Sequence, residues 1–89
     1  MPEAFVCINA SPDSVDQLLI QLRACKEIKE AFRVHGVYDI ITKVTAETLE
    51  DLSNIIDTRI KRLSEVQNTL SMLTMNPPDF AKKTQLLTV

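Results

Sequence analysis

The residues best suited to chemistry in this chain stand together in one short stretch, 34-VHGVYDII-41. This stretch holds the only glycine, the only histidine and the only tyrosine of the 89 residues, and Asp39 follows Tyr38 directly. Because glycine readily takes a positive φ, Gly36 predicts a tight turn with accessible backbone amides. The carboxylate of Asp39 could bind an ammonium group, and the amides could bind a carboxylate.

A second group of polar residues stands near the end of the chain. Thr69 and Ser71 are two apart in a segment with the pattern of a strand, so both hydroxyls should lie on one face. The turn and these hydroxyls together offer partners for both charges of a zwitterion. A plainer interpretation stays open, in which the stretch is only a hairpin turn and Asp39 caps or solubilises its end.

Four segments have the apolar or alternating pattern of strands: 4–10, 28–35, 38–45 and 66–75. The second and third are separated only by the short link that contains the glycine, which predicts an antiparallel hairpin. In the second segment, a period of two would place one set of side chains on a single face: Ile28, Glu30, Phe32 and Val34.

Two further segments have the pattern of amphipathic helices. Ser11 is a candidate N-cap, and Pro12 a candidate first helical residue, of a helix that ends near Cys25. The second predicted helix spans 46–63, and the acids in its first turns suit the helix dipole. The apolar stripes expected to face the core are Val15, Leu18, Leu19 and Leu22 in the first helix, and Leu49, Leu52, Ile56, Ile60 and Leu63 in the second.

The order βαββαβ predicts an α+β fold, a ferredoxin-like sandwich with a four-stranded antiparallel sheet and two helices on one face. We expect one domain over 1–76 and a tail over 77–89 that begins at Pro77-Pro78 and has no firm pattern. Several strands are apolar on both sides, as in sheets covered on both faces. The second face is therefore expected to be covered by another subunit, in a two-fold dimer that pairs through the sheet. The alternative is a monomer with some apolar side chains exposed on that face.

Composition excludes several classes of function. The net charge is −2 and no basic run is present, so the chain has no electrostatic footprint for nucleic acid. Two cysteines far apart and one histidine do not make a zinc set, and we expect no metal and no cofactor. No nucleophile–base pair and no glycine-rich phosphate loop is present, which argues against an enzyme. Without a secretory signal or transmembrane run, the expected location is the cytoplasm.

Three segments resemble a known family: 4-AFVCIN-9, 35-HGVYDIITKV-44 with its G-x-Y-D turn, and 69-TLSMLTM-75. They are similar to the RAM domain (regulation of amino acid metabolism) of the Lrp/AsnC transcriptional regulators. The resemblance implies a domain that senses small metabolites. It implies dimers that pair through their sheets and assemble into octameric or decameric rings, with amino acids bound in clefts between subunits near the turn.

The resemblance also implies a role for each residue of the candidate site. Asp39 would bind the α-amino group of the ligand, directly or by orienting its neighbours. The other expected roles are a tight turn with accessible backbone at Gly36, the lining of the side-chain pocket at Val37, the cleft wall at Tyr38, and positions near the ligand for Thr69 and Ser71.

The sequence departs from the family pattern in three ways. It begins at the first RAM strand and lacks the helix-turn-helix domain, so we expect it to act by co-assembly with full-length Lrp/AsnC regulators and not to bind DNA itself. Ser64-Glu65 replaces the Pro-Gly usual before the last strand, and Ser71 stands where threonine is commoner.

The alternative function is a pure assembly module without ligand response.

Overall fold

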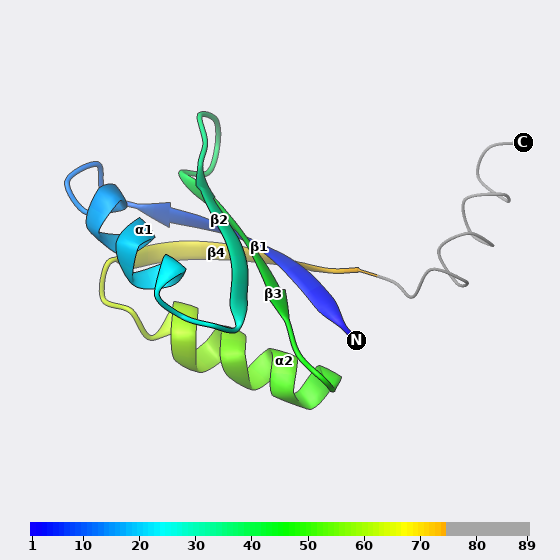
Figure 1. The fold of residues 1–89 in the computed structure, drawn as a ribbon. Coiled ribbons are helices and arrows are strands. Elements are labelled where there is room, and N and C mark those ends of the chain that lie inside the picture. The colour runs from blue at the N-terminus through cyan, green and yellow to red at the C-terminus, as the bar shows by residue number, and fades with distance from the viewer. Residues whose placement is uncertain (75–89) are drawn as a thin grey trace, which may run out of the picture.

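The computed structural model of the protein describes residues 1–74. The predicted end of the last strand at residue 75, Pro77-Pro78 and the predicted tail 77–89 lie outside the described residues. Within residues 1–74 the predicted order of strands and helices is confirmed (Figure 1).

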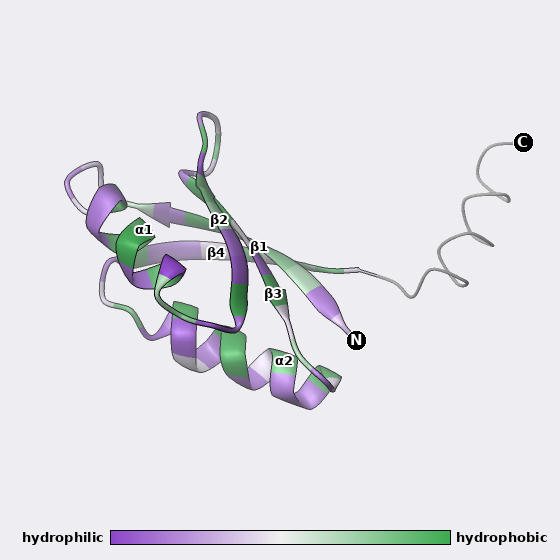
Figure 2. Cartoon of the chain, viewed as in Figure 1, coloured by the Kyte–Doolittle hydropathy of each residue, from purple (hydrophilic) through white to green (hydrophobic). Residues whose placement is uncertain are grey.

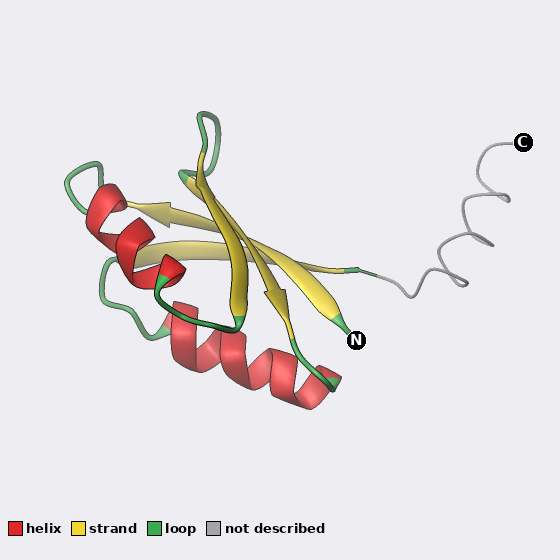
Figure 3. Cartoon of the chain, in the orientation of Figure 1, coloured by secondary structure: helices red, strands yellow, loops and turns green. Residues whose placement is uncertain are grey.

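The elements form one sheet with a helical layer on one side. The strands are β1 (Glu3–Ala10), β2 (Ile28–Arg33), β3 (Ile40–Thr45) and β4 (Val66–Leu73), and the helices are α1 (Val15–Arg23) and α2 (Leu49–Ile56), the latter continued by a π-helical turn, η1 (Asp57–Lys61). The four strands are antiparallel in the order β2-β3-β1-β4. Both helices lie on the same side of the sheet (Figure 3). This is the predicted ferredoxin-like sandwich.

The core lies between the helices and one face of the sheet. Alternate residues of the two central strands enter it, and polar and apolar bands alternate along α2 (Figure 2). Thr42 is fully buried among these residues, and its hydroxyl donates to the carbonyl of Val6 at 3.0 Å. The largest fully buried side chains besides Thr42 are Ile8, Leu18, Leu22, Ile40, Leu52, Ile60, Val6, Val15 and Val44.

The first helix begins later than predicted. Residues 11–14 form a separate turn, in which the amide of Ser14 donates to the carbonyl of Ser11 at 2.9 Å. The helical ladder then starts with the amide of Leu18 and the carbonyl of Ser14. Ser11 as N-cap and Pro12 as first helical residue were therefore wrong predictions, because the turn places the cap position at Ser14.

The predicted facing of β2 was also wrong, because the strand contains an irregularity. Ile28 pairs with Val44, but Glu30 already pairs with Lys43. This shift adds one residue to β2 and reverses the face of every residue that follows. Ala31 therefore joins Ile28 in the core at 4% exposure, and Phe32 turns to the open side of the sheet at 51% exposure.

The second helix is shorter than predicted and changes its winding. It begins after Thr48, whose hydroxyl accepts the amide of Asp51 at 3.0 Å. Leu49 is the first residue after the cap and is 62% exposed, so its predicted place in the core was wrong.

The reason for the change of winding is the spacing of the buried residues. Leu52, Ile56 and Ile60 are four apart, whereas an α-helix has 3.6 residues per turn, so its core-facing stripe drifts. The wider π-turn η1 corrects that drift. It returns Ile60 to the core, where it is fully buried.

Candidate functional site

The stretch around Gly36 is a loop and not the tight hairpin turn that was predicted. β2 ends at Arg33 and β3 begins at Ile40, and the loop between them projects beyond the sheet (Figure 1). The amide of Val34 donates to the carbonyl of Asp39 at 2.9 Å and closes the base of the loop. Gly36 has φ +153°, a conformation that favours glycine, so the expectation that the loop depends on this glycine stands.

Asp39 ties this loop to the end of β1. Its amide donates to the carbonyl of Ile8 at 2.9 Å. Its carboxylate oxygen Oδ2 accepts the amide of Ala10 at 2.9 Å and lies 3.5 Å from Nδ2 of Asn9. One carboxylate oxygen thus positions the protein's own backbone. The second oxygen, Oδ1, makes no hydrogen bond within residues 1–74, so it could still accept a ligand's ammonium group.

Asn9 is a positioning residue that the sequence analysis did not single out. Its side-chain amide donates to the carbonyl of Val37 at 2.7 Å, which holds the tip of the loop against β1. Asn9 follows Phe5 and Cys7 in the alternation of β1, so it lies on the open side of the sheet. Its signal in the sequence was a lone carboxamide in the otherwise apolar segment 4–10.

Thr69 and Ser71 lie apart from the loop within one chain. They stand opposite Ile8 and Val6, whose side chains are buried under the helices. Residues directly opposite in an antiparallel pair share a face, so both hydroxyls lie on the helical side of the sheet. β1 separates β4 from β3. The chain therefore brings Gly36, Val37, Tyr38 and Asp39 together, and it does not bring Thr69 or Ser71 to them.

An apolar row crosses the open side of the sheet. Phe32 pairs with Ile41, Ile41 with Cys7, and Cys7 with Leu70, so one side chain comes from each strand. Phe32 is 51% exposed and Leu70 45% exposed. In the neighbouring row Phe5 stands opposite Met72, and both remain partly exposed. Cys7, in the middle of the row, is only 6% exposed, so the exposed apolar side chains lie at the ends of the row and on the neighbouring one. Clusters of exposed apolar side chains are candidates for interaction sites.

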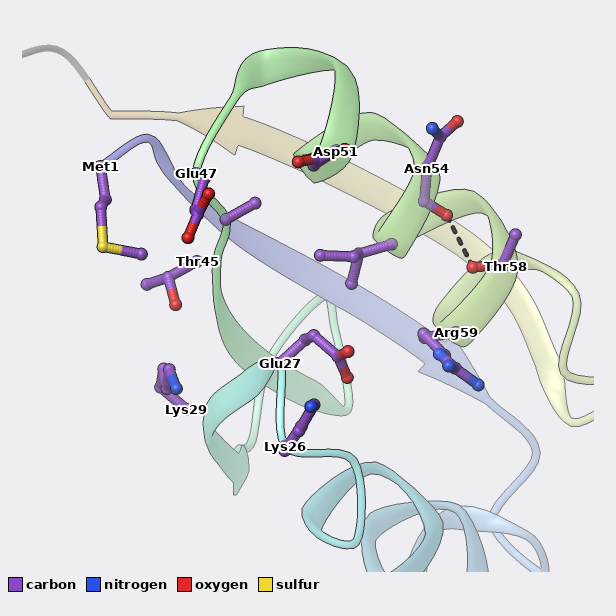
Figure 4. A pocket seen from close by; sticks show the side chains of 12 residues that line it. Met1, Lys26, Glu27, Lys29, Thr45, Glu47, Asp51, Asn54, Thr58 and Arg59 are labelled. Carbon is purple, nitrogen blue, oxygen red and sulfur yellow. Dashed lines mark hydrogen bonds between the residues drawn. The ribbon is translucent and has the colours of Figure 1, made fainter.

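A cavity of about 560 Å³ lies on the other side of the molecule, between α2 with η1 and the link from α1 to β2 (Figure 4). Glu27 faces it, and the thiol of Cys25 donates to the Oε1 atom of Glu27 at 3.1 Å. That hydrogen bond, with smaller contributions from the charges of Arg59 and Lys26, lowers the pKa of Glu27. Burial, together with the hydrogen bond to Glu27, raises the pKa of the Cys25 thiol.

Residues 3–83 match the family model of the Lrp/AsnC ligand binding domain. The chain belongs to this family. Regulatory protein AsnC of Haemophilus influenzae is 28% identical over 71 residues, which are 80% of this chain and 47% of that protein. The chain thus spans about half the length of this relative.

Two solved structures share the fold. The crystal structure of FFRP-DM1 is 35% identical with a TM-score of 0.81, over 84% of this chain and 100% of that chain. Transcriptional regulator NMB0573 of Neisseria meningitidis, solved as a complex with L-Met, is 15% identical with a TM-score of 0.76, over 85% of this chain and 51% of that chain. The second likeness concerns the fold alone.

Two features are absent from the described part of the chain. No group of three or more His, Cys, Asp or Glu side chains among residues 1–74 is placed to hold a metal ion. In the same part, every helix is too short or too polar to span a membrane.

Proposed function

We propose that this domain senses an amino acid or a related small metabolite, which it binds in clefts between subunits beside the loop of residues 34–39. Membership in the ligand-binding family supports this, as does the L-Met complex of a regulator with the same fold. The observation that carries the proposal is the loop itself. Asn9 and Asp39 fix it from one side, while Gly36 and Val37 remain exposed at its tip.

The recognition chemistry follows from the groups that the loop leaves available. Oδ1 of Asp39 would accept the ammonium group of the ligand, and the main-chain amides at the exposed tip would donate to its carboxylate. Tyr38, which is half-buried, would form the wall of the cleft, and Val37 would contact the ligand side chain.

The position of β4 supports a cleft shared between subunits. Thr69 and Ser71 lie beyond β1 from the loop of their own chain. A site that uses both groups would therefore take the loop from one subunit and the hydroxyls from its neighbour. A ligand bound there would favour one arrangement of the subunits, because it binds that arrangement more tightly than others.

The dimer would form through the open side of the sheet. The apolar row Phe32–Ile41–Cys7–Leu70 would pack against its copy around a two-fold axis, and dimers would assemble further into an octameric or decameric ring. The domain would act in the cytoplasm by co-assembly with full-length Lrp/AsnC regulators, without enzymatic activity and without contacting DNA itself.

The second candidate function is an assembly module whose cleft binds no metabolite. The same apolar row favours it, because the burial of apolar side chains drives association without a ligand. The two functions differ in one outcome: only the sensor changes its stability or mass on addition of an amino acid in a way that Asp39→Ala abolishes.

Thermal melts of the purified protein against the twenty amino acids test the sensor, with Asp39→Ala measured alongside. A ligand at 100 times its dissociation constant stabilises the folded state by about 2.7 kcal/mol, which raises the melting temperature of a domain this small by roughly 10 °C. We expect a shift with one or a few amino acids that Asp39→Ala abolishes. A panel without any shift would leave the assembly module as the function.

A further inference from the structure

The cavity beside Glu27 is a candidate for a second binding site, separate from the loop and from the open side of the sheet. It continues into a neighbouring cavity of about 420 Å³, and the two share Lys26, Glu27, Thr58 and Arg59. Both volumes fall in the range of small-molecule sites. Together they form a groove, which we call the helix-side groove, between the α1–β2 link and η1.

Glu27 is held in place at the centre of this groove. Its carbonyl accepts the amide of Thr45 at 3.3 Å, and its Oε1 atom accepts the thiol of Cys25 at 3.1 Å. These contacts orient the backbone and one carboxylate oxygen of Glu27 toward the protein. The second carboxylate oxygen, Oε2, makes no hydrogen bond within residues 1–74.

Two cations flank this carboxylate without pairing with it. Figure 4 shows Glu27 between Lys26 and Arg59. Their charges favour the ionised form of Glu27, but less than the hydrogen bond from Cys25 does. Among the ion pairs of the described residues, however, none involves Lys26, Glu27 or Arg59, so each lies more than 4.0 Å from an opposite charge. The groove therefore holds separated charges with space between them.

The winding of the second helix positions one of these cations. The π-turn η1 returns Ile60 to the core, and the neighbouring Thr58 and Arg59 line the groove. Single π-turns occur often at functional sites. The hydroxyl of Thr58 donates to the carbonyl of Asn54 at 2.7 Å, so its oxygen offers lone pairs to a ligand donor (Figure 4).

We propose that the helix-side groove binds a small zwitterion, with its ammonium group on Glu27 and its anionic group between Arg59 and Lys26. A ligand with both charges satisfies the free carboxylate oxygen and both cations at once. The groove is also lined by Lys29, Glu47 and Asp51. A simple anion would therefore face the three acids, including Glu27, and a simple cation would face the three bases, including Arg59 and Lys26. This site does not depend on the loop of residues 34–39 or on dimerisation.

Amide chemical-shift titrations of the full chain test the site. The probes are glycine, β-alanine and γ-aminobutyrate, with acetate and ethylammonium as compounds that carry one charge each. We expect saturable shifts of amides in residues 24–28 and 55–59 with at least one zwitterion. Acetate and ethylammonium should bind at least about tenfold more weakly, because each satisfies only one side of the groove.

Variants locate the binding and separate it from the proposed sensor site. Arg59→Gln and Glu27→Gln should each weaken binding about tenfold or more, while Arg62→Gln, an exposed cation outside the groove, should leave it unchanged. Asp39→Ala should leave it unchanged too, so this site and the sensor site can fail independently. Shifts that never saturate, equal binding of acetate, or equal losses in Arg59→Gln and Arg62→Gln would each overturn the proposal.

Discussion

Asn9 holds the loop of residues 34–39 against the end of β1. Its amide fixes the carbonyl of Val37 and approaches Oδ2 of Asp39, so two residues of the loop depend on one side chain of β1. We expect Asn9→Ala to lower the free energy of unfolding by about 1 kcal/mol, the usual net value of such a hydrogen bond. Hydrogen exchange at the amides of Val34 and Ala10 should become faster, because both donate to Asp39.

Asn68 provides the matched control for that variant. It stands opposite Asn9 on β4, is exposed, and makes no side-chain hydrogen bond within residues 1–74. Asn68→Ala should leave exchange at Val34 and Ala10 unchanged in the same urea-melt and exchange experiments. Equal effects of the two variants would contradict the positioning role of Asn9.

Substitution of Gly36 should destabilise the protein because of the backbone conformation of this residue, and not because a side chain would clash with its neighbours. A Cβ atom added to Gly36 would meet nothing within 4 Å, but φ is +153°. Gly36→Ala should therefore cost about 1–3 kcal/mol of strain, or force the loop into another conformation. Denaturant unfolding measures this cost. Val37→Ala, at an 84% exposed neighbouring position, should change stability by less than about 0.5 kcal/mol.

Glu27 should contribute to the loss of stability that the protein undergoes as the pH is lowered. Its folded-state pKa is lowered from 4.5, mainly by the hydrogen bond from Cys25, so the unfolded chain binds a proton more readily. The stabilisation is present above pH 4.5 and is lost as the pH falls through the folded-state pKa. In Glu27→Gln, the free energy of unfolding should therefore decrease less steeply than in the parent as the pH falls below 4.5. A profile with the same slope as the parent would contradict the contribution of Glu27.

At the scale of elements, the sequence predicts which helical face is buried, because hydrophobic periodicity determines it. It does not predict where a helix begins or where a strand is irregular, because local hydrogen bonds determine both. The stripe Val15, Leu18 and Leu22 is buried as predicted, because one helical face must cover the sheet. The start of α1 was misplaced because a turn over residues 11–14 takes the amide of Ser14. The irregularity between Ile28 and Glu30 has no signal in the residue types, because it depends on how β2 pairs with β3.

Thr48 should be the more important of the two helix caps. Its hydroxyl accepts the amide of Asp51, whereas Ser14 at the start of α1 makes no side-chain bond to its helix. Thr48→Ala should cost about 1 kcal/mol of unfolding free energy, and Ser14→Ala a few tenths. Urea melts of the two variants check this difference. The cap assignment would be wrong if Ser14→Ala cost as much as Thr48→Ala.

At the scale of the whole molecule, the candidate site could be predicted only in part. The loop residues are adjacent in sequence, so Gly36 to Asp39 could be grouped without a structure. Thr69 and Ser71 were grouped with them by chemistry, but β1 lies between the two groups. Whether a neighbouring subunit reunites them depends on assembly, and the residue types of one chain do not encode that geometry.

Assembly itself can be tested at Leu70. This side chain ends the apolar row on β4 and is 45% exposed in the single chain, so a lysine there is tolerated by a monomer. In a dimer paired through the sheet, Leu70→Lys would bury unpaired ammonium groups, at a cost of about 3–5 kcal/mol that raises the dissociation constant more than about a hundredfold. Light scattering and sedimentation should show an assembled parent and a monomeric variant. Ile20→Lys, at a 71% exposed position on α1, should assemble as the parent does. A Leu70→Lys protein as large as the parent would show that the subunits do not pair through the open side of the sheet.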